Sequence, residues 1–107
     1  MAEDLGYARS QAPAPRMARI SWSIQASPQL AAIVDYLEEF DPSAARRLGA
    51  RLLELADSLR EFLNRGRPIP QGRREMVTVR PYILRYVHEG DTVVILGIRH
   101  AAQLSED

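Results

Sequence analysis

The sequence predicts a small α+β domain in which one strand and a helix hairpin precede a three-stranded antiparallel meander. The strands are expected to form one antiparallel sheet that packs on the hairpin. Three observations support this prediction. Two consecutive segments carry apolar residues at helical spacing, and each opens with a proline start signal. Three short apolar runs follow, separated by Arg80-Pro81 and by Glu89-Gly90-Asp91. Alternation of apolar and polar residues from Arg19 to Gln25 adds the first strand.

Length and composition exclude several classes of protein. A chain of 107 residues, 46% of them hydrophobic, has the size and composition of one globular domain. No apolar run approaches the roughly 20 residues that span a bilayer, and the N-terminus lacks the apolar middle of a secretory signal. The absence of cysteine excludes a disulfide framework and a thiolate metal site. We therefore expect a cytoplasmic protein without a cofactor, a bound metal or a membrane partner.

The two ends of the chain carry little pattern. Residues 1–18 contain Pro13 and Pro15 and no apolar period, so they are predicted to form a disordered tail. Met17 is an alternative to Met1 as the start of translation. We expect a single domain over residues 19–103 and a short acidic tail over residues 104–107.

The first strand and the two helices follow from periodicity and capping. Ile20, Trp22 and Ile24 alternate with polar residues, which is typical of a half-buried strand, and Trp22 is expected in the core. Ser27-Pro28 supplies an N-cap and a proline for the first helix, and Asp41-Pro42 repeats this signal for the second. The short turn between them requires antiparallel helices. The second helix has a stop near residues 64–66. Its apolar seam consists of Leu48, Leu52, Leu55, Leu59 and Phe62.

The remaining residues are predicted to form a loop and the meander. Residues 66–72 are a loop by composition, and strands are expected over residues 76–79, 82–88 and 92–99. Gly90 suits the first position of a two-residue hairpin turn. Alternation then divides the last two strands into two faces. The aromatic-rich face should cover the helices: Tyr82, Leu84, Tyr86, Val93 and Ile95. The other should be exposed or covered by a partner: Ile83, Arg85, Val87, Val94, Leu96, Ile98 and His100.

Charge is divided unevenly along a chain whose net charge is zero. Residues 27–64 hold seven acids and four arginines, whereas residues 65–100 hold seven arginines and three acids. The C-terminal half therefore carries a positive field that favours an anionic partner. All 14 basic residues are arginine. Genome composition explains this bias most simply, and selection for bidentate phosphate or carboxylate contacts is the alternative.

Few motifs point to catalysis. The sequence has no glycine-rich phosphate loop, metal-ligand cluster or nucleophile elbow. His100 is a candidate general acid or base, with Arg85 and Arg99 as phosphate clamps. A structural or partner-contact role is the favoured interpretation of this histidine. The arginines at 65, 67, 73 and 74 are a candidate nucleic-acid contact, but they lack interleaved aromatic residues for base stacking. Direct nucleic-acid binding therefore stays open.

Three pieces of the C-terminal third, in this order and spacing, carry a family resemblance. They are Tyr82-x-Leu84-x-Tyr86, the return strand from Gly90 to Leu96, and Arg99-His100-x-x-Gln103. Together with the order of elements, they resemble the RelE/ParE superfamily of type II toxin–antitoxin toxins over residues 20–103. The resemblance implies a small toxin neutralised by a labile antitoxin encoded beside it.

The resemblance offers two activities. RelE-like toxins cut messenger RNA in the ribosome with basic residues on the first meander strand, after the second strand's aromatic residue and beyond the last strand. Here those positions hold Met76, Val77, Thr78, Ile83 and the segment Gln103 to Asp107. The loss of positive charge at a scissile phosphate would slow cleavage greatly. The sequence therefore resembles the ParE-like branch, which inhibits DNA gyrase; the alternatives are a RelE-like ribonuclease and a non-toxic antitoxin-binding relic.

Two sets of residues are predicted to make the contacts. The target-binding set lies at strand ends or on the face away from the hairpin: Arg80, Arg85, Arg99, His100 and Gln103. The antitoxin-binding set is aliphatic, since one hairpin covers only one face of the sheet: Ile83, Val87, Leu96 and Ile98.

Overall fold

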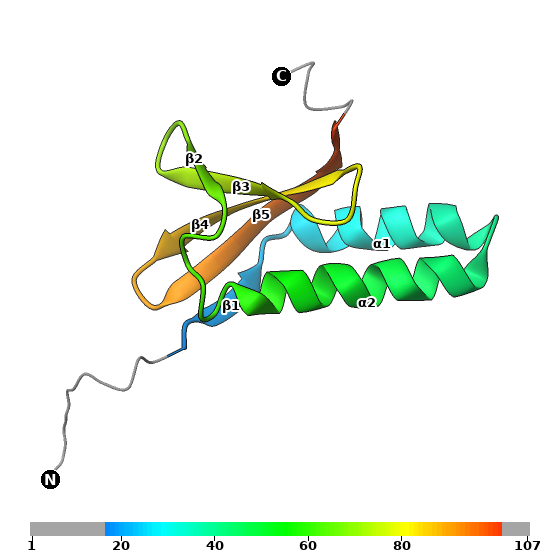
Figure 1. The fold of residues 1–107 in the computed structure, drawn as a ribbon, viewed down its shortest axis with the longest axis horizontal. Coiled ribbons are helices and arrows are strands. Elements are labelled where there is room, and N and C mark those ends of the chain that lie inside the picture. Colours follow the sequence, from blue (N-terminus) through cyan, green and yellow to red (C-terminus); the bar gives the residue numbers. More distant parts are fainter. Residues whose placement is uncertain (1–16, 102–107) are drawn as a thin grey trace, which may run out of the picture.

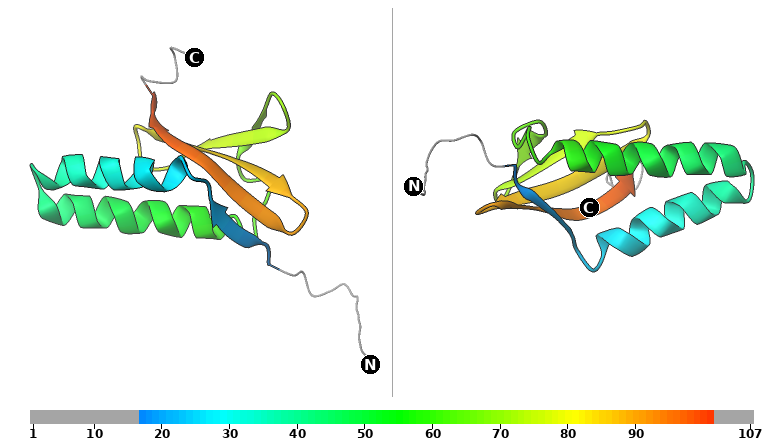
Figure 2. Two further views of the ribbon diagram at one scale, coloured as in Figure 1. Left: turned by 180° about the vertical axis from the view of Figure 1, so that it is seen from behind. Right: turned by 90° about the horizontal axis from the view of Figure 1, so that it is seen from below.

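A helix hairpin lies against one face of a five-stranded sheet (Figure 1), as two further views show (Figure 2). The computed structural model describes residues 17–101, so Gln103, residues 1–16 of the predicted N-terminal tail and the whole predicted acidic tail lie outside the described part. Ala18, at the end of the predicted tail, is buried. The predicted fold class is confirmed by these elements: β1 (Arg19–Trp22), α1 (Ala26–Glu38), α2 (Pro42–Ser58), β2 (Arg67–Ile69), β3 (Arg73–Val77), β4 (Tyr82–Glu89) and β5 (Thr92–His100).

The sheet has the strand order β1-β5-β4-β3-β2. Strands β3, β4 and β5 form the predicted antiparallel meander. Glu89 pairs with Thr92, which confirms the two-residue turn, and Gly90 has a φ of 60°. In contrast to the expected antiparallel sheet, β1 pairs with β5 in parallel. Because the helices and three strands separate β1 from β5, no tight turn dictates their relative direction.

The loop predicted for residues 66–72 contains a strand that the sequence analysis missed. Arg67 pairs with Glu75 and Ile69 pairs with Arg73, so β2 and β3 form a hairpin and β3 begins three residues earlier than predicted. The segment was predicted as a loop because it contains Pro68 and Pro70, and proline cannot donate to a ladder of hydrogen bonds. Pro68 is tolerated because β2 is the last strand of the sheet, where one side needs no donor.

The two helices differ in how well their starts were predicted. Asp41 caps α2 as expected, since its Oδ1 accepts a hydrogen bond from the N–H of Ala44 at 3.0 Å. The predicted cap of α1 is wrong. This helix begins at Ala26, whose N–H donates to Ser23 Oγ at 3.1 Å, and Ser27 lies inside the helix. Strand β1 ends at Trp22, so Ser23 lies beyond the strand and its hydroxyl can accept from the N–H of Ala26 at the start of the helix.

The core lies between the hairpin and the sheet face predicted to cover it. Its buried members from the meander include the predicted Leu84, Tyr86, Val93 and Ile95, and Trp22 packs against them. Leu59 at the end of the α2 seam is fully buried. Neither described helix is long and apolar enough to cross a membrane.

A β-bulge in β5 changes the face that Ile98 occupies. Arg85 pairs with Gly97, but the next residue of β4 pairs with Ile95, so β5 contains one extra residue, Leu96. The extra residue shifts the alternation by one position. Ile98 therefore turns toward the helices and is 2% exposed, which makes its predicted exposure wrong.

Two residues predicted for apolar faces are exposed instead. Helix α2 ends at Ser58, so Phe62 is out of phase with the seam and 58% exposed. Strand β1 ends at Trp22, so Ile24 lies outside the sheet and is 88% exposed. In both cases the prediction extended a periodic pattern beyond the end of its element.

Candidate functional site

The sheet face away from the hairpin, called the outer face below, contains two of the predicted target-binding residues, Arg85 and Arg99. Strand register places Arg67, Glu75 and Arg85 in one row across β2, β3 and β4. Gly97 of β5 pairs with Arg85 and extends the row. Several cationic and aliphatic residues share the outer face with this row: Arg73, Val77, Ile83, Val87, Val94 and Arg99.

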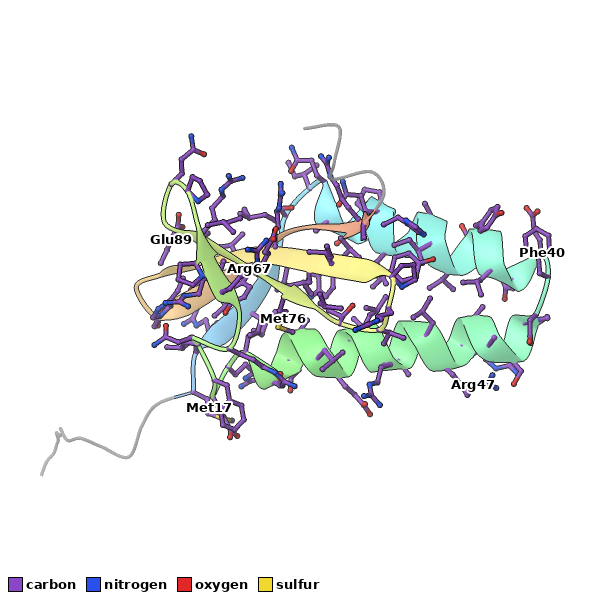
Figure 3. All side chains as sticks on the ribbon, turned by 45° about the horizontal axis from the view of Figure 1, so that its top comes forward. Met17, Phe40, Arg47, Arg67, Met76 and Glu89 are labelled. Carbon is purple, nitrogen blue, oxygen red and sulfur yellow. The ribbon has the colours of Figure 1, made fainter. Side chains whose placement is uncertain are left out.

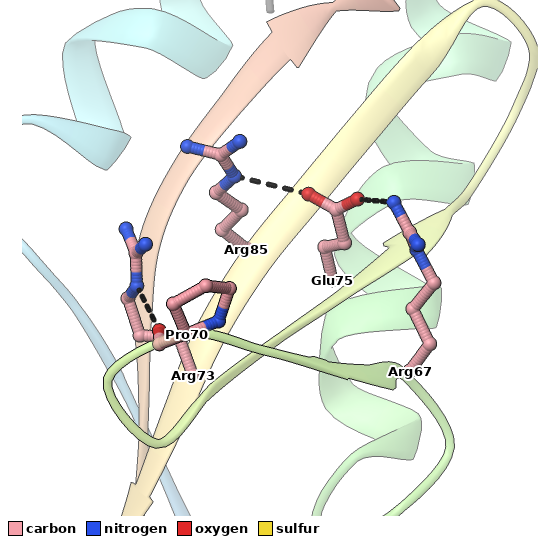
Figure 4. A network of polar contacts seen from close by, with 5 residues as sticks. All are labelled: Arg67, Pro70, Arg73, Glu75 and Arg85. Atoms are coloured by element: carbon pink, nitrogen blue, oxygen red, sulfur yellow. Dashed lines mark hydrogen bonds and ion pairs between the residues drawn. The ribbon is translucent and has the colours of Figure 1, made fainter. Parts of the chain in front are cut away.

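Glu75 is the centre of an ionic network on this face (Figure 4). It is the only buried charged residue in the described part of the chain, at 6% exposure. Its Oε2 accepts a hydrogen bond from Arg85 Nε at 3.1 Å, and its Oε1 accepts one from Arg67. Burial acts to raise the pKa of Glu75, but hydrogen bonds and positive charge from Arg85 and Arg67 outweigh burial and lower the pKa. The network therefore orients Arg85 with an ionised carboxylate.

The bulge separates His100 from the two arginines. Arg99 pairs with Ile83, on the same face as Arg85. His100 pairs with Tyr82 instead, and the two rings are in edge-to-face contact with centroids 5.8 Å apart. Since Tyr82 belongs to the face that covers the hairpin, His100 and the arginines lie on opposite faces of the sheet.

The other predicted contact residues are dispersed. Arg80 is exposed in the connection between β3 and β4, and Gln103 lies outside the described residues. In the antitoxin-binding set, Ile83 and Val87 are half-buried on the outer face. Leu96 is half-buried at the bulge, and Ile98 belongs to the core.

Two polar residues that the sequence analysis did not single out support the bulge. Gln29 Oε1 of α1 accepts a hydrogen bond from the N–H of Ile98 at 3.0 Å, and Ser23 Oγ donates to the carbonyl of Leu96 at 3.1 Å. Gly97 has no side chain, and a Cβ there would lie 2.9 Å from Gln29 Oε1. A glycine inside a predicted strand was the available signal, because it often marks a bulge or a close approach.

A second missed interaction secures the chain before β2. Tyr86, which is fully buried, donates from its hydroxyl to the carbonyl of Leu63 at 2.8 Å and accepts from the N–H of Gly66 at 2.9 Å. A Cβ at Gly66 would lie 2.8 Å from the Tyr86 ring and 2.9 Å from the carbonyl oxygen of Glu75. Only glycine fits this close approach, which holds the segment after α2 against the sheet.

The described residues contain no cluster of three or more His, Cys, Asp or Glu side chains that could hold a metal ion. Shallow grooves are present instead. One, of about 390 Å³, lies beside β3 and is lined by Arg65, Arg67, Glu75, Met76, Val77 and Ile83. Another, of about 410 Å³, lies between β1 and α2 and is lined by Ile20, Trp22, Leu53, Glu54 and Asp57. Both grooves are partly open to solvent.

The model of one protein family, described as ParE toxin of type II toxin-antitoxin system, parDE, matches residues 20–105. The chain belongs to this ParE toxin family. The resemblance to the RelE/ParE superfamily is thereby confirmed, and the protein is a toxin of a type II toxin–antitoxin system.

Curated relatives of this ParE family member are similar over most of their length. Toxin RelE2 of Caulobacter vibrioides is 46% identical over 88 residues, which cover 82% of this chain and 100% of that protein. Putative toxin Y4kP of Sinorhizobium fredii is 39% identical, over 79% of this chain and 90% of that protein.

Two solved structures share the fold. A structure of the chromosomal ParDE toxin–antitoxin system from P. aeruginosa matches with a TM-score of 0.71 and 26% identity, over 78% of this chain and 96% of the matched chain. The toxin–antitoxin complex RelBE2 from Mycobacterium tuberculosis matches with a TM-score of 0.56 and 26% identity, over 79% and 92%.

Proposed function

We propose that this toxin inhibits DNA gyrase without catalysing a reaction, and that a cognate antitoxin neutralises it. The observation that carries the choice between the two activities is the position of His100. A ribonuclease needs its acid–base group and its cations within reach of the same phosphate. Here His100 contacts Tyr82 on one face of the sheet, whereas Arg85 and Arg99 belong to the other.

The positions that are basic in RelE-like toxins give further support. Met76 packs against the core on the helix side of the sheet (Figure 3), and Val77 on the outer face is apolar. Ile83 follows the aromatic Tyr82 and cannot bind a phosphate. Arg85, two residues after Ile83 on the same face, is paired with Glu75. A phosphate there would compete with a carboxylate that is already in place.

The outer face has cationic side chains beside apolar ones, and this supports the proposed binding to gyrase. Arg73, Arg85 and Arg99 can meet an acidic surface of gyrase or the DNA that it holds. Their arrangement around half-buried aliphatic residues is typical of a binding surface and requires no reacting group.

The antitoxin is proposed from the family and from the structural neighbours. The RelBE2 structure is by name a toxin–antitoxin complex, and the ParDE structure is by name from a toxin–antitoxin system. A purified toxin should therefore bind the product of the adjacent reading frame. Soluble, monomeric toxin that fails to bind this product would contradict the antitoxin proposal.

A supercoiling assay tests the proposed target. Purified toxin should block ATP-dependent supercoiling of relaxed plasmid by gyrase, and the Arg99→Ala/His100→Ala variant should block it less while still binding antitoxin. Arg51→Ala, an exposed arginine on α2, is the matched control and should inhibit like the wild type. In cells, toxin without antitoxin should stall replication, induce the DNA-damage response and cause filamentation.

Toeprinting of messenger RNA on ribosomes tests the alternative. Codon-specific cleavage that disappears in His100→Ala, with normal supercoiling, would assign the protein to the ribonuclease branch. A protein that is inactive in both assays but binds antitoxin would be the non-toxic antitoxin-binding relic.

A further inference from the structure

A groove lies between the N-terminal half of α2 and the connection from β3 to β4. The helix hairpin extends beyond the sheet (Figures 1 and 2), so the sheet covers only part of its length. The groove has a volume of about 570 Å³, and its lining residues are Ala44, Arg47, Leu48, Arg51, Thr78 and Val79. One side of α2 and the chain just beyond β3 therefore form its two walls.

This groove combines apolar surface with two cations. Leu48 and Val79 are half-buried, whereas Arg47 and Arg51 are exposed and lie four residues apart on one side of the helix. Arg47 donates to the neutral hydroxyl of Ser43 at 2.8 Å, and neither arginine belongs to an ion pair within the described part of the chain. No acid is among the lining residues. The groove therefore favours a segment with an aliphatic side chain and a carboxylate.

The chain leaves β5 beside this groove. The N–H of Ala101, the residue after β5, donates to the carbonyl of Pro81 at 2.8 Å. The N–H of Tyr82 donates to the carbonyl of Val79 at 2.9 Å, and a turn closed in this way keeps its ends within about 7 Å. Residues 102–107, which lie outside the described part, therefore continue from a point next to the wall that Val79 forms.

The sequence of residues 102–107 complements the groove. The segment contains one large aliphatic residue, two acids and no base: Leu104, Glu106 and Asp107. At about 3.3 Å per residue, an extended chain spans roughly 10 Å from Ala101 to Leu104 and roughly 20 Å from Ala101 to Asp107. The shorter span exceeds the length of the turn at Val79, so the aliphatic side chain can reach the groove and the acids can reach its arginines.

We propose that residues 102–107 occupy this groove in the folded toxin. Leu104 packs on Leu48, and Glu106 pairs with Arg51. The segment then covers the part of α2 that the sheet leaves open. This contact lies within one chain, so it is independent of gyrase and of the antitoxin.

Charge distinguishes this groove from the two described above. The groove between β1 and α2 contains Glu54 and Asp57, which repel an acidic segment. The groove beside β3 contains Glu75, and Arg67 there already donates to this carboxylate. Of these three grooves, only the one beside the β3–β4 connection has two cations and no acid among its lining residues.

Thermal unfolding of the full-length toxin at low salt tests the ion pair. Arg51→Glu and Glu106→Arg should each lower the midpoint of unfolding by about 4 °C, and the charge-swapped double variant should regain most of this loss. Arg46→Glu, at an exposed position of α2 outside the groove, is the matched control. Combined with Glu106→Arg, its effect on the midpoint should be additive.

The absence of native cysteine permits a direct test of position. In Leu48→Cys/Leu104→Cys, mild oxidation should join the two side chains within one chain, because a disulfide requires Cα atoms about 4.4–6.8 Å apart. Ala50→Cys/Leu104→Cys places one cysteine at an exposed position of α2 outside the groove and should stay reduced. Proteolysis and mass spectrometry identify the bonded residues.

An intramolecular disulfide in the groove variant, together with coupling between Arg51 and Glu106, is the expected result. Absence of this disulfide, or equal oxidation of the control variant, would overturn the inference. A disulfide between two chains would assign the groove to a second copy of the toxin and would overturn it as well. If the Leu48→Cys variant does not fold, the unfolding cycle decides, and additive effects of Arg51→Glu and Glu106→Arg would then refute the contact.

Discussion

His100 contacts Tyr82 edge to face, with ring centroids 5.8 Å apart and ring planes at 84°. The contact exists because the bulge at Leu96 shifts β5 by one residue and pairs His100 with Tyr82. Arg99, one residue earlier, pairs with Ile83 on the outer face. Adjacent residues of the predicted target-binding set therefore serve two different surfaces.

Arg99→Ala and His100→Ala should act independently on gyrase inhibition. Their side chains lie on opposite faces of the sheet, so the two free-energy losses should add within about 0.5 kcal/mol, and the loss in the double variant should equal the product of the single losses within roughly twofold. The measurement is the toxin concentration that halves supercoiling. A double variant no weaker than one of the single variants would show that both residues share one contact.

Glu75→Gln should lower the free energy of unfolding at neutral pH by about 1–3 kcal/mol, because a charged acceptor of two hydrogen bonds is lost. The pKa of Glu75 is lower in the folded state, so its contribution is complete above the unfolded value and is lost as pH falls through the folded value. The difference between wild type and variant should therefore shrink below about pH 4.3.

Urea titrations at several pH values measure this dependence. Glu89→Gln, at the exposed end of β4, is the control and should change stability by less than about 0.5 kcal/mol. A constant difference between wild type and Glu75→Gln down to pH 3 would contradict the ionic role of Glu75.

Tyr86→Phe should destabilise the fold by about 1–3 kcal/mol, since it leaves the N–H of Gly66 and the carbonyl of Leu63 without their partner. Chemical denaturation gives the free energy of unfolding. Tyr36→Phe removes a hydroxyl from a side chain that is 64% exposed and should have an effect below about 0.5 kcal/mol. Equal effects of the two substitutions would refute the proposed anchor.

Gly97→Ala should displace the Gln29 side chain and remove its hydrogen bond to Ile98, at a cost of about 1 kcal/mol. Gln29→Ala should have a similar cost, because it removes the same bond. The double variant should then be about as stable as either single variant, a coupling that a double-mutant cycle measures. If the two losses of stability were additive, Gly97 would not act by making room for the Gln29 side chain, and another role, such as backbone freedom at the bulge, would be indicated.

Local signals in the sequence were sufficient for the fold class and most elements. The Asp41-Pro42 helix start and the Gly90 turn each depend on residues within a few positions of one another, so the signals persist in the folded chain. Alternation along β4 likewise predicted which of its side chains face the helices. The motif in the C-terminal third also led to the family, since its residues are close in sequence.

Contacts between distant residues decided the rest. The β5 bulge turns Ile98 into the core and His100 away from Arg99, and Gln29, 69 residues before Ile98, satisfies the backbone there. A single inserted residue reverses every later side chain in a strand, and alternation alone gives no sign of the insertion. The sequence by itself therefore determined most of the elements and the family, whereas the tertiary structure decided which residues share a face, because the register depends on hydrogen bonds from distant segments.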